Sequence, residues 1–111
     1  MAKRLRPPPK HLKKIDQEEL DQILRDHKLY IKSRGRRGIQ AIFKDIDFTG
    51  LSFRSAWLQD IDFKGNWFQD CDFNFARMAG CDFEDCWVEG STSHAVDFTQ
   101  MNIKGTLWDE D

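Results

Sequence analysis

A five-residue period of large apolar residues constrains the fold of this chain more than any other feature. The stretch CDFNFARMAGCDFEDCWVEG, residues 71–90, places such a residue at Phe73, Met78, Phe83 and Val88. On an α-helix, a step of five residues turns by roughly 140° and scatters the series around the axis. On a flat strand, the same step changes the face each time. Neither element can bury the series on one side.

The period runs without an insertion from residue 43 to residue 108, and a second, mostly small or apolar series lies two residues before each large position. A chain that turns in the same sense after every five residues buries both series. Four such units make one square coil of twenty residues, and successive coils stack at roughly the 4.8 Å spacing of neighbouring strands. Residues 41–108 supply about three and a half coils.

The units IDFTG, IDFKG, CDFNF, CDFED and VDFTQ carry a family resemblance. They resemble the pentapeptide-repeat family, which implies a right-handed quadrilateral β-helix and does not imply an enzyme. The predicted fold class is therefore an all-β solenoid, a right-handed quadrilateral β-helix of about three and a half coils capped by one N-terminal α-helix. The unit STSHA puts Ser93 at a large position, where we expect a local void, a water or a bulge.

The segment before the repeats has the pattern of a helix. Asp16 followed by Glu19 forms a capping box, and Ile15 with Leu20 forms a hydrophobic staple. An apolar stripe recurs at helical spacing. Its members are Leu20, Ile23, Leu24, His27 and Ile31. We expect a helix over 15–35 that covers the open end of the solenoid, a linker over 36–40, and pentapeptide repeats over 41–111.

Charge divides the chain into a basic head and an acidic body. Residues 1–40 hold twelve Lys and Arg against five Asp and Glu, a net charge of +7, whereas residues 41–111 hold five against fourteen, a net charge of −9. Residues 1–14 are expected to be a flexible basic arm around three prolines. The basic residues of this arm are Lys3, Arg4, Arg6, Lys10, Lys13 and Lys14.

Catalytic and cofactor chemistry is not expected. Cys71, Cys81 and Cys86 fall in the inward small series and have no CxxC partner, so they are interpreted as reduced, apolar core residues rather than metal ligands. The three histidines are scattered, and no phosphate loop or nucleophile–base pair is present. We expect no cofactor, no metal and no enzyme. With no apolar signal or membrane-spanning run, we also expect a cytoplasmic protein that does not bind membranes.

Residues twenty apart are expected to lie above one another, so outward columns can be assigned. The candidate partner-binding residues in these columns are Trp67, Trp87, Asp47, Asp62, Asp82 and Asp72. Trp67 and Trp87 either stack on each other or lie under the helix, or they form a binding face, because tryptophan is enriched in interface hot spots. On the opposite column, Arg77 is expected to lie about 5 Å over Trp57 and to pair with Asp97.

The first hypothesis for function is a non-catalytic protein-binding module that presents a rigid acidic solenoid with an outward tryptophan column. The alternative is a DNA mimic that binds or inhibits a DNA-binding enzyme such as DNA gyrase or another topoisomerase, as some members of the family do. A second alternative is nucleic-acid binding, which only the basic N-terminal arm could support through phosphate contacts. The partner is thus expected to be a protein, and the oligomeric state stays open.

Overall fold

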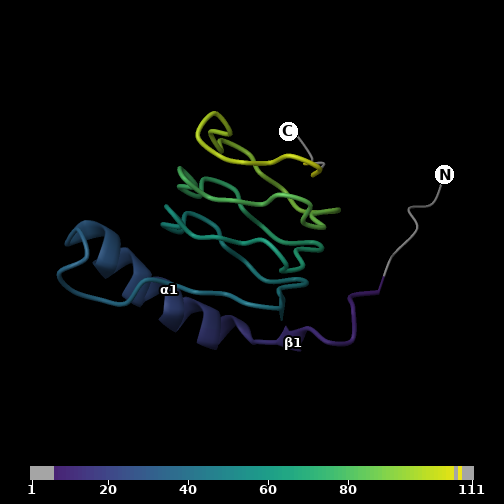
Figure 1. Ribbon diagram of the computed structural model, residues 1–111, viewed down its shortest axis with the longest axis horizontal. Coiled ribbons are helices and arrows are strands. Elements are labelled where there is room, and N and C mark those ends of the chain that lie inside the picture. Colours follow the sequence, from purple (N-terminus) through teal and green to yellow (C-terminus); the bar gives the residue numbers. More distant parts are fainter. Residues whose placement is uncertain (1–6, 107, 109–111) are drawn as a thin grey trace.

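The computed structural model describes residues 7–106 and 108. One helix, α1 (Gln17–Lys32), lies across one end of a stack of layers, and the chain then winds upward through the stack, away from α1 (Figure 1). Two short strands, β1 (Lys13–Lys14) and β2 (Ile46–Asp47), pair in parallel beside α1. We call residues 41–106 the repeat stack and residues 41–60 its first layer.

The predicted fold class is wrong: the protein is not an all-β solenoid, and the right-handed quadrilateral β-helix is not retained. Within residues 7–106 and 108, the only sheet has two strands of two residues each, and α1 is the longest regular element. The reason is in the backbone, because φ is positive at every fifth residue from 45 to 95 and again at 105. Each extended segment is turned before a second residue can join a ladder, so the layers are held mainly by isolated bridges.

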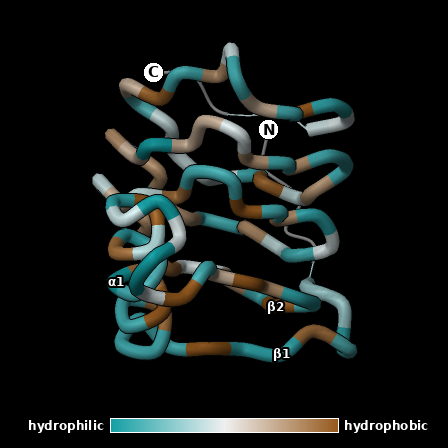
Figure 2. Tube along the Cα trace, turned by 60° about the vertical axis from the view of Figure 1, so that its left-hand side comes forward, coloured by the Kyte–Doolittle hydropathy of each residue, from teal (hydrophilic) through white to brown (hydrophobic). Residues whose placement is uncertain are grey.

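The predicted spacing of twenty residues between stacked positions is confirmed. Parallel bridges join Asp47 to Trp67, Trp57 to Arg77, and Asp62 to Asp82, all twenty residues apart. Hydrophobic and hydrophilic stretches alternate along each layer (Figure 2). Single bridges are enough to set the spacing, because the buried rings stack in the same register.

Phenylalanine ladders form the core of the repeat stack. Phe53 and Phe73 stack with ring centroids 4.7 Å apart, and Phe63 and Phe83 stack at 4.8 Å. The two ladders meet edge to face, as in the Phe73–Phe83 contact at 5.8 Å. These parallel and perpendicular contacts are the favoured arrangements of aromatic pairs, so burial and ring geometry favour the same register.

At Ser93 the sequence predicts a void, a water or a bulge, but in the structure an aromatic ring from the last repeat covers the core there. Ser93 is buried twenty residues after Phe73, where another phenylalanine would have stacked. The ring of Trp108 instead contacts Phe73 edge-on at 5.2 Å and also contacts Phe83 at 5.0 Å. The last large residue of the series therefore helps to cover the end of the core that faces away from α1.

Small polar side chains in the inward series join one layer to the next by a repeated hydrogen bond. In each case the donor lies 23 residues after the accepting carbonyl. The Cys71 Sγ donates to Phe48 O at 3.0 Å, and Ser91 Oγ donates to Phe68 O at 2.7 Å. Asn66 follows the same rule toward Phe43 O at 3.1 Å. Carbonyls at the turns are thus satisfied inside the core.

The cysteine thiols are part of this pattern. Cys81 Sγ donates to Leu58 O and Cys86 Sγ donates to Phe63 O, at 2.9 and 3.2 Å. Burial, which disfavours the thiolate, raises the pKa of Cys71 and of Cys81 to about 12 and that of Cys86 to about 11. All three thiols are free and protonated, as expected of core residues.

Helix α1 begins as its sequence predicts, because the Asp16 side chain accepts a hydrogen bond from Glu19 N–H at 2.8 Å. Leu20, Leu24 and His27 are its buried residues, and they pack toward the first layer. Gly38 returns the chain across the helix, where any Cβ would clash with the backbone of α1 at Asp26. The stripe thus covers the open end of the stack.

His27 fixes α1 to both ends of the first layer. Its ring is fully buried; Nδ1 accepts from Ala41 N–H at 3.0 Å, and Nε2 lies 2.8 Å from Gln59 O. Since Nδ1 accepts from a backbone amide, the proton resides on Nε2, which donates to the carbonyl. The neutral imidazole therefore satisfies one donor and one acceptor that the layer would otherwise bury without partners.

Candidate functional site

The four candidate aspartates form hydrogen bonds within the turns of the repeat stack. Asp47, Asp62, Asp72 and Asp82 each accept, through Oδ1, a hydrogen bond from the backbone N–H two residues later, at 2.8–3.0 Å. This arrangement stabilises a turn by local side-chain pairing. These aspartates therefore stabilise the corners of the repeat stack.

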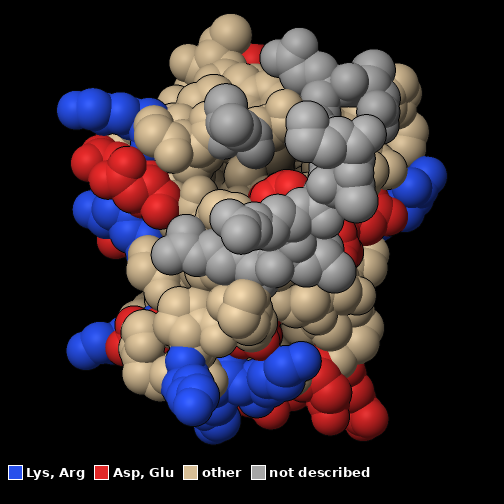
Figure 3. Space-filling view, turned by 90° about the vertical axis from the view of Figure 1, so that its right-hand side faces the viewer, with Lys and Arg blue, Asp and Glu red and all other residues tan. Residues whose placement is uncertain are grey.

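Cations lie beside two of these aspartates. Arg54 lies 3.5 Å from Asp72, and Lys64 lies 3.4 Å from Asp82. The carboxylates of Asp82 and Asp62 favour the charged ammonium of Lys64 and raise its pKa, with Asp82 the larger cause. Along one edge of the face in Figure 3, Lys and Arg side chains stand between Asp and Glu side chains. Positive and negative charge thus alternate on that edge.

Trp67 and Trp87 stack on each other, which is the packing alternative of the two considered. Their ring centroids are 5.2 Å apart, Trp67 is buried at 6% exposure, and its Nε1 donates to Gln69 Oε1 at 3.2 Å. A hollow of about 310 Å³ beside them is also lined by the N-terminal segment, at Pro9 and His11. The indoles therefore lie next to this segment rather than under α1.

The N-terminal segment is attached to the repeat stack near its lower end. Lys13 and Lys14 form β1, which pairs with β2 in the register Lys13–Ile46 and Lys14–Asp47. Lys14 also lies 3.9 Å from Asp47. Lys10 is exposed, and the predicted arm residues Lys3, Arg4 and Arg6 lie outside the described residues. At least the last two residues of the predicted arm are held by backbone pairing.

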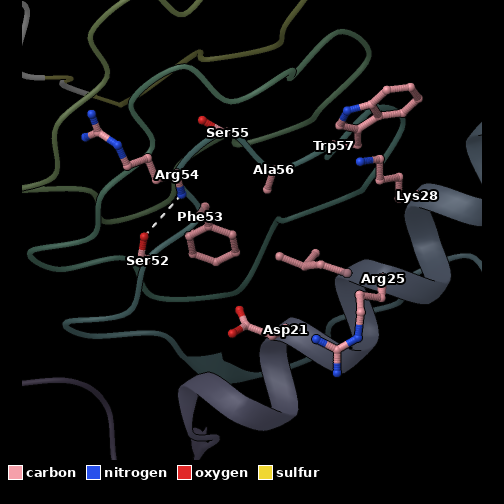
Figure 4. Close-up of a pocket in the computed structure, with 10 residues that line it drawn as sticks. Asp21, Arg25, Lys28, Ser52, Phe53, Arg54, Ser55, Ala56 and Trp57 are labelled. Atoms are coloured by element: carbon pink, nitrogen blue, oxygen red, sulfur yellow. Dashed lines mark hydrogen bonds between the residues drawn. The ribbon is translucent and has the colours of Figure 1, made fainter.

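A groove runs along the seam between α1 and the first layer (Figure 4). We call it the seam groove; its volume is about 260 Å³. Lys28 reaches from α1 toward Trp57, Arg25 lines the groove with its side chain running along the helix, and Ser52 and Ser55 border it from the first layer. Its lining residues are Asp21, Leu24, Arg25, Lys28 and the six residues 52–57. The groove combines an apolar floor with a rim of cations and hydroxyls.

Trp57 is the centre of a cation cluster at one end of this groove. Arg77 lies over the indole with its guanidinium carbon 4.3 Å from the ring centroid, which confirms the predicted contact. Lys28 adds a second cation at 5.2 Å. No carboxylate of residues 7–106 or 108 lies within 4.0 Å of the charged nitrogens of Lys28 or Arg77. Both cations can therefore accept an external anion.

The predicted pair between Arg77 and Asp97 is wrong. Asp97 is exposed and accepts from Thr99 N–H at 2.9 Å and from Thr99 Oγ1 at 2.6 Å, which lowers the pKa of its carboxyl. The carboxylate is thereby used in its own turn. Sequence analysis missed Arg25 and Lys28; their spacing of three residues, which places them on one face of a helix, was the available signal.

Neither a metal-binding cluster nor a membrane-spanning helix occurs in the part of the chain that the structure describes. Residues 7–106 and 108 contain no group of three or more His, Cys, Asp or Glu side chains arranged to hold a metal ion. Helix α1, the only helix among them, is too short and too polar to cross a bilayer.

Comparisons with known proteins give structural similarity but no sequence match. No protein-family model matches the chain, and no curated protein sequence matches it. Among solved structures, the chain is similar to a pentapeptide repeat protein of the Arabidopsis thaliana thylakoid lumen, with 22% identity and a TM-score of 0.39. The match covers 61% of this chain and 48% of that protein, so the chain spans about half its length.

Proposed function

We propose that this chain is a pentapeptide-repeat protein that acts as a non-catalytic protein-binding module, with the seam groove as its contact surface. The observation that carries the proposal is the cluster at Trp57, a half-buried tryptophan beside two cations that lack carboxylate partners among the described residues. Tryptophan and arginine are the residues most enriched in interface hot spots. Here both lie beside a groove with an apolar floor.

The Trp57 side is preferred over the Trp67–Trp87 side for a physical reason. A side chain contributes to binding through the surface that it loses to a partner, and Trp67 has little left to lose at 6% exposure. The indoles of Trp67 and Trp87 serve mainly to bind two layers together through their stacked faces. DNA mimicry, nucleic-acid binding by the arm and a cytoplasmic location stay predictions.

A site-specific crosslinking experiment tests the proposed surface. A photoreactive benzoylphenylalanine replaces Ser55 on the groove, or the exposed Thr99, two layers farther from α1, as a control, in cells of the native host. We expect a discrete protein adduct from position 55 and none from position 99. The adduct should disappear when Arg77→Glu and Trp57→Ala are added, while thermal melts show that these variants stay folded.

The proposal is wrong if position 55 gives no adduct, or if the adduct survives both substitutions. Adducts from position 99 alone would move the contact surface to layers of the repeat stack farther from α1.

A further inference from the structure

The edge of the first layer that faces α1 presents backbone N–H and C=O groups toward the helix. The chain itself supplies hydrogen-bond partners for part of this edge. At β2, strand β1 supplies the pairing. At Ser52, the side-chain amide of Gln17 takes the place of a strand: Gln17 Nε2 donates to Ser52 O, and Ser52 N–H donates to Gln17 Oε1, both at 2.8 Å. These two of the four sides of the layer are thereby closed by strand-like hydrogen bonds.

Trp57 occupies the equivalent position on the next side of the layer. Leu58 N–H donates to Arg77 O at 2.8 Å, and Arg77 N–H donates to Ala56 O at 2.9 Å. Backbone groups alternate in direction along an extended segment, so the N–H and C=O of Trp57 point away from the layer above, toward α1. Within residues 7–106 and 108, no group forms a hydrogen bond with either of them. This edge position lies on the seam groove and is open.

We propose that an extended, acidic segment of a partner protein adds to this edge, pairing with the N–H and C=O of Trp57. The inference rests on the proposed function and specifies the partner's chemistry. Addition of a strand to an open edge is a common mode of peptide recognition. Here the main-chain bonds would repeat what β1 provides at Ile46–Asp47.

Charge identifies the segment as acidic. Lys28 and Arg77 flank the Trp57 ring without a carboxylate within 4.0 Å among the described residues. Arg25 also lines the groove, where its Nη2 donates to Gln22 Oε1 at 2.8 Å, and Asp21 is hydrogen-bonded by Gln17 at 2.9 Å. Carboxylates on the incoming segment would supply the missing partners through charge-assisted hydrogen bonds. A basic segment would instead meet like charge at the helix.

The volume and the lining of the groove indicate which side chains the segment would carry. A volume of about 260 Å³ is below the roughly 300–1,000 Å³ typical of sites for whole small molecules. It suits one apolar side chain against Leu24, Phe53 and Ala56. Since side chains alternate along an extended chain, acidic and apolar residues in alternation would place carboxylates at the rim and an apolar residue on the floor.

Nuclear magnetic resonance with designed peptides tests the inference. The probe is acetyl-Glu-Val-Glu-Val-Glu-amide, added to the ¹⁵N-labelled full chain up to roughly 1 mM, with the Lys-for-Glu peptide as control. We expect the acidic peptide to shift the Trp57 amide and to slow its hydrogen exchange several-fold, and the basic peptide to do neither. Lys28→Glu with Arg77→Glu should weaken the acidic peptide at least tenfold and favour the basic one.

Backbone methylation separates strand addition from charge attraction alone. Two versions of the acidic peptide carry N-methyl groups on the valine amides or on the glutamate amides. In a paired strand only alternate amides face the partner, so one version should lose at least tenfold in affinity and the other should bind almost normally.

Several outcomes would overturn strand addition. Equal binding by both methylated peptides, or no response of Trp57 to any acidic peptide, would refute it, while the seam crosslinks could still support the proposed function. Concentration-dependent dimerisation that protects the Trp57 amide without peptide would also refute it, because the occupant would be a second copy. Loss of both the peptide response and the crosslinks would overturn the proposed function as well.

Discussion

Replacing His27 by leucine should destabilise the protein strongly, although leucine is apolar and of similar size. The buried imidazole accepts from Ala41 N–H and donates to Gln59 O, so leucine leaves one backbone donor and one acceptor buried without partners. Each unsatisfied group costs about 1–3 kcal/mol, which gives a loss of about 2–6 kcal/mol. Domains of this size have about 5–15 kcal/mol in total, so the loss is a large share of the stability.

Urea and thermal unfolding, followed by circular dichroism, measure this loss. His27→Gln keeps an amide donor and acceptor and should recover part of the stability. His94→Leu is the matched control, because His94 is exposed and its change should stay within about 0.5 kcal/mol. If His27→Leu melts within error of the wild type, the two hydrogen bonds do not hold α1 to the first layer, and the reasoning fails.

Three further predictions concern the repeat stack. Phe63→Asp should abolish cooperative unfolding because a charge enters the core, whereas Lys64→Asp, one residue on and exposed, should shift the urea midpoint only slightly through loss of the Asp82 pair. Equal effects in urea melts would exclude this register. Gly80→Ala should destabilise more than Gly50→Ala although φ is near +78° at both, because a Cβ at 80 meets the Asp60 carboxylate and one at 50 meets open space; an Asp60→Ala background that leaves the difference unchanged would contradict this explanation. Because the three thiols have raised pKa values in the folded state, stability should be full below about pH 9 and fall toward pH 11, by up to about 1.4 kcal/mol per thiol per pH unit; a triple Cys→Ser variant that loses the same stability in urea melts at about pH 10.5 would refute this origin.

The sequence period predicted which residues stack, and it did so for a reason that is local. Phe53, Phe63 and Phe73 are placed by their spacing alone, since any chain with a turn every five residues brings positions twenty apart together. The secondary-structure class could not be predicted in the same way. It depends on how many residues stay extended between turns, and positive φ at positions such as Asp60 leaves room for little more than single bridges.

The candidate site was only partly accessible to sequence analysis. The Arg77–Trp57 contact follows from the repeat spacing, and it was predicted correctly. The contributions of Lys28 and Gln17 depend on where α1 crosses the first layer, which no repeat pattern specifies. Burial of Trp67 could not be predicted either, because it requires the position of a neighbouring N-terminal segment outside the repeats.

The constant separation of twenty residues between bridged positions has a consequence for how the chain folds. Every layer closes a loop of the same length, at an entropic cost of about 2.7 kcal/mol from the logarithmic term, and no layer must wait for a distant part of the sequence. Topologies made of such uniform closures fold by adding neighbours to an existing unit. Since α1 and His27 already satisfy the first layer, assembly should start there and proceed toward Trp108, and the end bearing Trp108 should be the first to exchange its amide protons with solvent.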